Sequence, residues 1–510
     1  MRWRSLAWLL LLVAAPVAAQ PVVTSAAPEG VAVTIYRAQD RDPGEQMNLG
    51  WLQGYALVTE KRTVTIPSGR AVIRFEGVAG GLLPESAIVT GLPAGVREKN
   101  LDADLLSPRS LYARSFGRPV ILRRTDPNTG TVREERAVIR SGEDGAAILQ
   151  TESGFEAINC GPLFEQPVYQ GVPAGLSPRP TLSIETDSPA AATVTLSLSY
   201  LAWGFDWQAN YVVNLREGGD RADLTAWVTL ANSDPTSFVD ADMAVVAGEV
   251  NREESRSYNF TPDQSLVLHC FFRPLPEEFE PVPMPAPAAP MMEGDIVVTG
   301  MRASLQSAKS SPVTVVGEDL GDLKLYRMPI PTTVASNAQK QVAMYLKPEV
   351  KVAILYRGWI DAGSPAATSI ERGLRFRNKK EDGLGVPLPS GPVAVFEPLG
   401  GTQALSGEGR TYDKAVGEEV DIALGDAEGL SASATESNAG ASTRAYSVTI
   451  ANAHPWPVRF EGSVRFDQGN YRIEKVSARL GRKDGWPLWK ATIPANGSVT
   501  LRYRLARIRD

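Results

Sequence analysis

Histidine is nearly absent from this sequence, since His269 and His454 are the only two in 510 residues. Transition-metal sites and serine or cysteine triads usually draw on histidine as a ligand or general base. The motifs G-x-S-x-G, H-E-x-x-H and G-x-x-x-x-G-K-[ST] are also missing. We therefore expect no metal, no cofactor and no acyl hydrolase activity, and we expect both histidines to be structural or exposed.

Cysteine is equally scarce, with only Cys160 and Cys270 present. In an oxidising compartment the two can pair. Closing a loop of about 110 residues would stabilise the fold by at most roughly 4–5 kcal/mol. Two separate buried thiols are the alternative, so Cys160 and Cys270 form a candidate disulfide only.

The sequence has no basic stripe and, after its first residues, no long apolar run. Its 52 basic and 58 acidic residues are interspersed, and the net charge is −6. Nucleic acid is therefore an unlikely partner. No stretch after the N-terminus is long and apolar enough for a transmembrane helix.

The N-terminus has the features of a secretory signal peptide. Arg2 and Arg4 precede a short apolar run over residues 6–15, and the small residues 17–19 offer a cleavage site. No cysteine directly follows this cleavage site, so a lipoprotein anchor is not supported. We expect residues 1–19 to be removed and the mature protein to be soluble, in the periplasm or secreted.

Helical periodicity is rare, whereas two-residue alternation recurs along the chain. In residues 56–75 two alternating runs flank Pro67-Ser68-Gly69, and near the C-terminus Asn496-Gly497 lies between two more. Both segments predict β-hairpins, and DPNTG (126–130) predicts another hairpin turn. The 45 glycines and 38 prolines also suit many short strands joined by turns. The predicted fold class is all-β and multi-domain, with antiparallel β-sandwiches and a Pro-rich linker or inserted loop.

Composition shifts suggest the division of the chain. The tract PLPEEFEPVPMPAPAAPMM favours extended polyproline conformation and resists packing. The predicted ranges are 20–190 for an N-terminal β domain, 191–272 for the first part of a second β domain, 273–320 for a flexible Pro-rich segment and 321–510 for a C-terminal β-sandwich.

Two kinds of residue pattern raise the question of chemistry. Asp102/Asp104 and Asp240/Asp242 are spaced two apart, which on a strand suits a calcium site or glycosidase-like acid chemistry, although solvated turns explain them more simply. In SYLAWGFDWQANYVV the odd positions carry Trp203, Phe205 and Trp207. A core strand explains this stripe better than a sugar-stacking platform.

Several motifs follow one another in a fixed order: VREKNLDADLLSPRSLYARSFGRPV, SYLAWGFDWQANYVVNL, VTLANSDPTSFVDADMAVVAGEVNR, GDLKLYRMPIPTTVASNAQKQV, FRNKKEDGLGVPLPSGPVAVFEP, GEEVDIALGDAEGL and YSVTIANAHPWPVRFEG. Their order resembles a bacterial domain of unknown function found in mucoidy inhibitor A-like exported proteins. The resemblance covers roughly residues 31–508. It departs from the family pattern at Asn232–Phe238, and the coiled coil of many members is missing. It implies a fold and an exported location, and no reaction.

A second resemblance concerns DIVVTGMRASLQSA, which looks like the TonB box of outer-membrane receptors, although no plug or barrel sequence follows. After a Pro-rich spacer, such a β-prone segment can add as a strand to a sheet edge of a partner or of this chain. The candidate partner-binding residues are Asp295, Ile296, Val297, Val298, Thr299 and Gly300, and the partner they imply is a TonB-like envelope protein. An ordinary edge strand is the alternative. We expect residues 281–312 to be poorly ordered in the isolated protein.

Taken together, these features favour a non-enzymatic binding or scaffolding module of the cell envelope. A glycan hydrolase using paired carboxylates is the alternative. A cleft with two carboxylates beside exposed aromatic rings would favour the hydrolase. Burial of Trp203, Phe205 and Trp207 would favour the scaffold.

Overall fold

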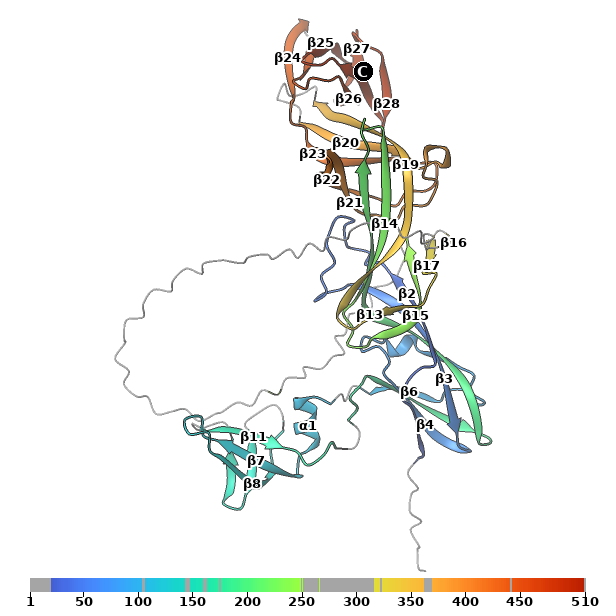
Figure 1. The fold of residues 1–510 in the computed structure, drawn as a ribbon, viewed down its shortest axis with the longest axis vertical. Coiled ribbons are helices and arrows are strands. Elements are labelled where there is room, and N and C mark those ends of the chain that lie inside the picture. The colour runs from blue at the N-terminus through green and yellow to red at the C-terminus, as the bar shows by residue number, and fades with distance from the viewer. Residues whose placement is uncertain are drawn as a thin grey trace, which may run out of the picture. The chain divides into compact units, whose positions relative to one another are not determined.

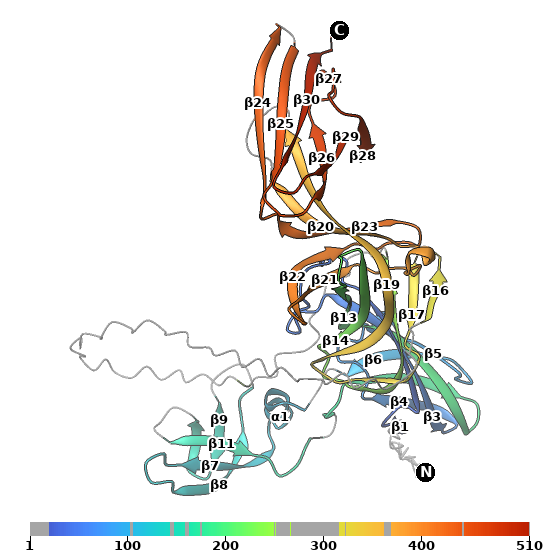
Figure 2. The same cartoon turned by 45° about the horizontal axis from the view of Figure 1, so that its top comes forward.

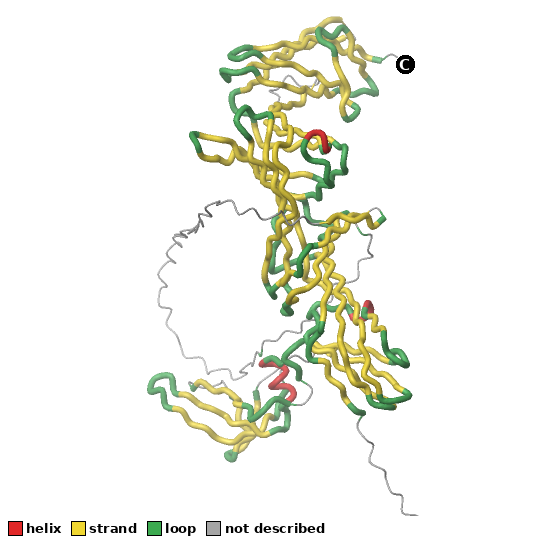
Figure 3. The backbone as a smooth tube through the Cα atoms, turned by 45° about the vertical axis from the view of Figure 1, so that its right-hand side comes forward, coloured by secondary structure: helices red, strands yellow, loops and turns green. Residues whose placement is uncertain are grey.

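The protein is described by a computed structural model covering residues 20–102, 106–142, 147–158, 163–173, 176–248, 250, 266, 316–321, 323–361, 369–440 and 443–508. Strands dominate these residues, and the single α-helix among them is α1 (Pro108–Arg114) (Figures 1 and 3). The predicted all-β fold class is confirmed. Within the described ranges, no helix has the length and apolar character needed to cross a membrane. The predicted signal peptide lies outside them.

The chain folds into two compact units, each built from separated segments. Unit 1 comprises Met1–Gly30, Glu60–Tyr200 and Arg256–Ser311, and unit 2 comprises Val31–Thr59, Leu201–Ser255 and Pro312–Asp510. The ranges expected from composition are continuous, because composition locates linkers but not the segments that two units exchange. The last five residues of the range assigned to the Pro-rich segment form β16 (Val316–Leu320), which pairs with β17 (Leu323–Arg327).

Unit 1 contains a sheet with a fully buried ion pair against it. The sheet order is β1 (Val22–Ser25), β4 (Gly69–Glu76), β12 (Thr181–Ser188) and β6 (Glu98–Asp102). The Nε of Arg62 donates to Glu60 at 2.7 Å, and its terminal nitrogens donate to the carbonyls of Ser25 and Glu76 at 2.8 and 2.9 Å. The Tyr200 hydroxyl donates to the other Glu60 oxygen at 2.7 Å. These bonds satisfy charges that would otherwise be costly to bury.

The second sheet of unit 1 runs in the order β10 (Gly154–Ala157), β9 (Ile148–Thr151), β8 (Val132–Ile139), β7 (Pro119–Thr125) and β11 (Phe164–Val168). Tyr112 of α1 is part of its core. The hairpin predicted at DPNTG is confirmed, since β7 and β8 pair on either side of it. Asp126 accepts the backbone N–H of Asn128 at 2.8 Å, and this bond lowers the pKa of Asp126.

Unit 2 begins with a β-sandwich, called here the first sandwich. One sheet orders β22 (Thr402–Thr411), β21 (Gly391–Leu399), the 201–215 part of β13 (Ala192–Leu215), β14 (Arg221–Asn232) and β19 (Ala338–Asp361). In the facing sheet β15 (Phe238–Ala247) pairs with β2 (Gly30–Tyr36), β17 and β18 (Thr332–Val334).

The aromatic stripe forms the core of this sandwich, as predicted. Phe205 and Trp207 are fully buried, and Trp203 is half-buried. The Phe205 ring lies 5.7 Å from that of Phe238 in the facing sheet, measured between centroids, and Trp207 Nε1 donates to the Val246 carbonyl at 3.0 Å. Burial of the stripe supplies much of the apolar surface removed from water here.

A second sandwich follows in unit 2. One sheet orders β24 (Leu430–Gly440), β25 (Thr443–Asn452), β30 (Ser498–Arg507) and β27 (Tyr471–Glu474), and Figure 2 shows β24, β25 and β30 side by side. The facing sheet orders β23 (Glu419–Asp426), β20 (Ile370–Arg377), β19, β26 (Val458–Arg465), β29 (Trp486–Ile493) and β28 (Leu480–Lys483). Its core includes Tyr446, Phe460, Trp489 and Tyr503. Strand β19 therefore belongs to both sandwiches.

Two of the predicted hairpins are wrong, although their strands and turns are present. Strand β3 (Gly54–Ile66) precedes the Pro67-Ser68-Gly69 turn, but β4 after it pairs with β1 and β12 instead. At Asn496-Gly497 the chain passes from β29 in one sheet to β30 in the other. A tight turn reverses the chain equally well within a sheet or between two packed sheets, so turn residues alone do not separate these cases.

The two sandwiches of unit 2 share a repeated strand–turn–strand element. LANSDPTSF (230–238) joins β14 to β15, and IANAHPWPV (450–458) joins β25 to β26. Asn232 Nδ2 donates to the carbonyls of Thr236 and Ala335 at 3.0 and 3.1 Å. Asn452 Nδ2 donates to those of Trp456 and Pro494 at 2.9 Å each.

The surroundings of the two asparagines also correspond. Each Oδ1 accepts a backbone N–H two residues on, at 2.8 Å for Asn232 and 3.0 Å for Asn452. Phe238 pairs with Val334 in the first sandwich and Val458 with Ile493 in the second. Asn337 and Asn496, in the turns that lead into β19 and β30, both have a φ of 49°. The two sandwiches are thus built on one structural plan, with an asparagine pinning the same turn.

Candidate functional site

Several residues singled out in the sequence lie outside the described residues. They are the candidate partner-binding residues Asp295, Ile296, Val297, Val298, Thr299 and Gly300, the cysteines Cys160 and Cys270, and His269. The strand-addition segment and the disulfide therefore stay predictions.

Neither carboxylate pair lines a cavity described below. Asp102 ends β6, and Asp104 lies outside the described ranges. Asp240 and Asp242 are exposed on β15, where the pairing shifts between Phe238 and Ala241 and Asp240 has a φ of 45°. The bulge leaves Val239 and Asp240 as two consecutive exposed residues, and Asp240 and Asp242 both face solvent on either side of the buried Ala241. In the described part of the chain, no group of three or more His, Cys, Asp or Glu residues is arranged to hold a metal ion.

The repeated turns point to a different site. In the first sandwich the turn 233–237 reads SDPTS, and Asp234 is buried and accepts the N–H of Thr236 at 2.8 Å. In the second sandwich the turn 453–457 reads AHPWP, and the Trp456 side chain is 55% exposed. Because the same backbone is built without a tryptophan in the first turn, the fold does not require Trp456.

His454 supports the exposed ring from below. The two rings stack with centroids 5.0 Å apart at an angle of 15°, and His454 lies 6.0 Å from the buried ring of Tyr356. A Cβ on Gly429 would lie 2.8 Å from His454 Cε1, so only glycine leaves room for the imidazole. His454 is half-buried, and Trp456 is held flat against it.

Trp456 lines a cavity of about 470 Å³ in unit 2. Its apolar wall includes Leu215, Val352, Ile354 and Tyr356, and Pro457 and Pro398 also border it. A cavity of this size is within the range of small-ligand pockets, about 300–1,000 Å³. A flat indole ring beside an apolar wall can accept an aromatic, aliphatic or sugar-ring face.

Charged groups surround the apolar part. Arg372 forms an ion pair with Glu397, and both side chains line the cavity. Arg459 and Asp220 also line it, and in the described part of the chain neither side chain has an ion-pair partner. The cavity thus offers one unpaired cation and one unpaired anion next to an indole ring.

A tight turn holds one side of the cavity. Residues 216–220 connect β13 to β14, with Gly218 and Gly219 at φ values of 95° and 70°, which favour glycine. The Val352 N–H donates to the Asp220 carbonyl at 3.0 Å and ties the turn to β19. Arg216 forms a bidentate ion pair with Asp223, at 2.9 and 3.1 Å from its Nη2.

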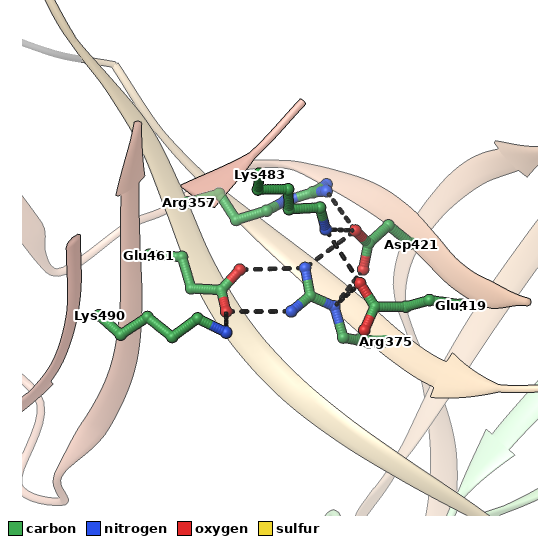
Figure 4. A network of polar contacts seen from close by, with 7 residues as sticks. All are labelled: Arg357, Arg375, Glu419, Asp421, Glu461, Lys483 and Lys490. Carbon is green, nitrogen blue, oxygen red and sulfur yellow. Dashed lines mark hydrogen bonds and ion pairs between the residues drawn. The ribbon is translucent and has the colours of Figure 1, made fainter. Parts of the chain in front are cut away.

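A charged network lies on the outer face of the sheet that contains β19, β20 and β26 (Figure 4). Arg375 and Asp421 are directly opposite on β20 and β23. Arg375 also bonds Glu461 at 3.0 Å, and Lys483 bonds Asp421 at 2.7 Å. The remaining members are Arg357, Glu419 and Lys490.

Most charged groups of this network pair with one another, whereas Arg357 Nε is buried without a hydrogen-bond partner. Burial alone would raise the pKa of Asp421, but hydrogen bonds from Arg375 and Lys483 outweigh it and lower the pKa to about 2. Burial opposes the shift at Glu461 as well, where Arg375 and Lys490 lower the pKa. The network therefore ties β20, β23, β26 and the β28–β29 hairpin together.

The prolines on both sides of Trp456 are a sequence signal for an exposed ring, which residue composition and motif spacing do not detect. Trp456 lies between Pro455 and Pro457, and a residue between two prolines cannot join the interior of a sheet. A large aromatic ring at such a position is exposed unless another segment covers it. The charged residues that line the cavity could not be predicted from the sequence, because they come from four separate elements. They are Arg459, Asp220, Arg372 and Glu397.

No protein-family model matches this chain, and a search of the curated proteins finds no match.

Proposed function

We propose that this chain is an exported, non-enzymatic binding module of the cell envelope that captures a partner protein in the cavity around Trp456. Export rests on the signal-peptide features of residues 1–19. The observation that carries the binding role is an exposed tryptophan in a turn whose counterpart is built without one.

The composition of the cavity favours a polypeptide partner. Tryptophan, tyrosine and arginine are the residues most enriched at the energetic centres of protein interfaces. Trp456 and the apolar wall receive an apolar anchor residue of the partner. Arg459 pairs with a carboxylate beside that anchor, since Arg459 has no ion-pair partner among the described residues.

A photo-crosslinking amino acid in place of Arg459 tests this proposal in cells. We expect it to capture one defined polypeptide, which is then purified and measured against the unmodified chain. Trp456→Ala weakens that binding at least tenfold, which corresponds to about 1.4 kcal/mol. Trp51→Ala is the matched control, because Trp51 is 65% exposed and lies in a different loop of unit 2. Equal binding by Trp456→Ala and the unmodified chain would refute the proposal.

A second variant replaces the turn of the second sandwich by the turn sequence of the first. The changes A453S, H454D, W456T and P457S convert the AHPWP turn into the SDPTS turn of the first sandwich. Asn452 and Pro455 stay, so the pinned turn is retained. We expect this chimera to melt within a few degrees of the unmodified chain and to lose partner binding.

A glycan hydrolase is the second candidate, because Asp220 and Glu397 bring two carboxylates to the cavity beside an exposed ring. Reducing-end release from an oligosaccharide panel distinguishes the two functions. Turnover that disappears in both Asp220→Asn and Glu397→Gln would establish the enzyme. Absence of turnover together with loss of partner capture in Trp456→Ala would support the binding module.

A further inference from the structure

A second cavity lies on the first sandwich, on the outer face of the sheet formed by β21, β13, β14 and β19. Its volume is about 620 Å³, and it shares no lining residue with the Trp456 cavity. One wall is the loop 37–53 between β2 and β3. Arg41 anchors this loop, because its Nε bonds the buried Asp206 carboxylate at 2.7 Å and its Nη2 donates to the Trp207 carbonyl at 2.9 Å. The wall is therefore held in place by buried polar contacts.

The floor of this cavity is a row of neutral polar side chains. Gln208, Thr229 and Gln341 are directly paired across β13, β14 and β19. Gln341 Nε2 donates to Thr229 Oγ1 at 3.2 Å, and Thr229 Oγ1 donates to Asn210 Oδ1 at 2.6 Å. This chain of bonds has a direction. Among the described residues it leaves the Asn210 amide nitrogen and the Gln341 carbonyl oxygen without a hydrogen-bond partner.

The next row on the same face adds an aromatic ring. Asn210 pairs with Trp227, and Trp227 pairs with Ala343 on β19. Trp227 is half-buried and lies in the row next to the cavity, outside the cavity's own lining residues. A flat ring next to free amide groups matches a sugar ring, whose C–H face stacks on the indole while its hydroxyls bond the amides.

The charged residues of the lining favour a neutral ligand over an ionic one. Glu408 and Arg410 are the charged side chains among its lining residues, and their charges cancel. An anionic glycan would need an excess of cationic groups, which the lining does not provide. An extended peptide would need free backbone groups. On this face β13 and β14 are paired on both sides, and among the described pairings the 338–347 part of β19 pairs with β14 alone, so a peptide would add at that edge rather than on the cavity floor.

We propose that this face binds a neutral oligosaccharide, with Asn210 and Gln341 bonding its hydroxyls and Trp227 stacking on one ring. This site goes beyond the partner-binding function and is independent of it. Hydroxyls both donate and accept, so they satisfy the Asn210 donor and the Gln341 acceptor together. A ligand without hydroxyls would leave one of these groups unpaired at a cost in affinity.

Isothermal titration of the full chain tests this site with four probes: cellotetraose, maltotetraose, trigalacturonate and tetra-alanine. We expect at least one neutral tetrasaccharide to bind, and the acidic sugar and the peptide not to bind. Asn210→Ala and Gln341→Ala each weaken binding at least tenfold. Gln403→Ala is the control, because Gln403 is an exposed glutamine on β22 outside the cavity lining.

Two further variants keep the result interpretable. Trp227→Phe retains an aromatic ring in the sheet and weakens binding less than the amide variants, and thermal melts confirm that every variant is folded. Trp456→Ala binds the sugar as the unmodified chain does, so failure of the partner-binding proposal leaves this one standing. No binding of either neutral sugar at millimolar concentration would overturn the proposal. Binding by both amide variants as tight as that of the unmodified chain would overturn it as well.

Discussion

At the scale of single residues, the buried asparagines carry more of the fold than their size suggests. Asn452 makes three hydrogen bonds that tie the two ends of one turn and the chain before β30. Replacing it by alanine leaves these buried backbone groups without partners. We expect Asn452→Ala to lower the free energy of unfolding by about 2–4 kcal/mol, as measured by urea denaturation.

The equivalent residue and an exposed one give the controls. Asn232→Ala should cost a similar amount, because its three bonds correspond one to one. Asn470→Ala, at an exposed position whose side chain bonds only Asp467, should change stability by less than about 0.5 kcal/mol. Stability of Asn452→Ala equal to that of Asn470→Ala would contradict the pinning role.

The Glu60–Arg62 pair in unit 1 allows a sharper test. Arg62→Met leaves the Glu60 carboxylate buried beside Tyr200 without its cation, and we expect it to cost about 3–5 kcal/mol. Adding Glu60→Gln to that variant removes the orphaned charge. The double variant should therefore be more stable than Arg62→Met alone. A less stable double variant would show that the unpaired Glu60 charge does not cause the loss of stability in Arg62→Met.

At the scale of elements, the charged network of the second sandwich makes stability depend on pH. The folded pKa of Asp421 is about 2, below its value in an unfolded chain of about 3.9. Its stabilisation is therefore fully present above about pH 4 and is lost as the pH falls through about 2. After allowance for solvent screening, we expect a loss of about 1–2 kcal/mol.

Urea denaturation at several acidic pH values measures this loss. Asp421→Asn should be less stable than the unmodified chain at neutral pH, and the difference should shrink between about pH 4 and pH 2. Glu217→Gln, at an exposed position outside the network, serves as the control. A difference between Asp421→Asn and the unmodified chain that stays constant with pH would argue against the linkage.

The same scale shows what could be predicted from the sequence. Alternation of apolar and charged residues predicts both the strand β30 and its buried face, because one side of β30 meets a core and the other does not. The buried side carries Leu501, Tyr503 and Leu505, and the other carries Arg502 and Arg504. The pairing of strands could not be read in this way. Neither turn chemistry nor alternation says which sheet the next strand enters, and for this reason two hairpins were predicted where the chain crosses between sheets.

The candidate site was less accessible than the fold. Carboxylates spaced two apart and an aromatic stripe are the conspicuous patterns in the sequence, yet the stripe is core and Asp240 is part of a bulge. The exposed tryptophan became informative only once its turn could be compared with the equivalent turn of the first sandwich. That comparison depends on backbone hydrogen bonds, which have no direct mark in the sequence.

At the scale of the whole molecule, the pairing of the two cysteines depends on the compartment in which the protein resides. Both lie outside the described residues. If the chain is exported, we expect a Cys160–Cys270 disulfide that forms in an oxidising environment. Thiol labelling after denaturation without reductant should then find no free cysteine, and labelling of two thiols would exclude the disulfide.

Strand β19 has a consequence for the speed of binding. Its residue Lys351 pairs with Arg221 in the first sandwich, and the next residue, Val352, pairs with Phe376 in the second. No unpaired residue separates the two ladders, so no hinge is available at this position. The cavity around Trp456 takes Leu215 from the first-sandwich side of this junction and Val352 and Arg459 from the second-sandwich side. Association with a partner should therefore proceed in a single step whose observed rate rises linearly with partner concentration. A rate that levels off at high concentration would reveal an opening step that this junction does not provide.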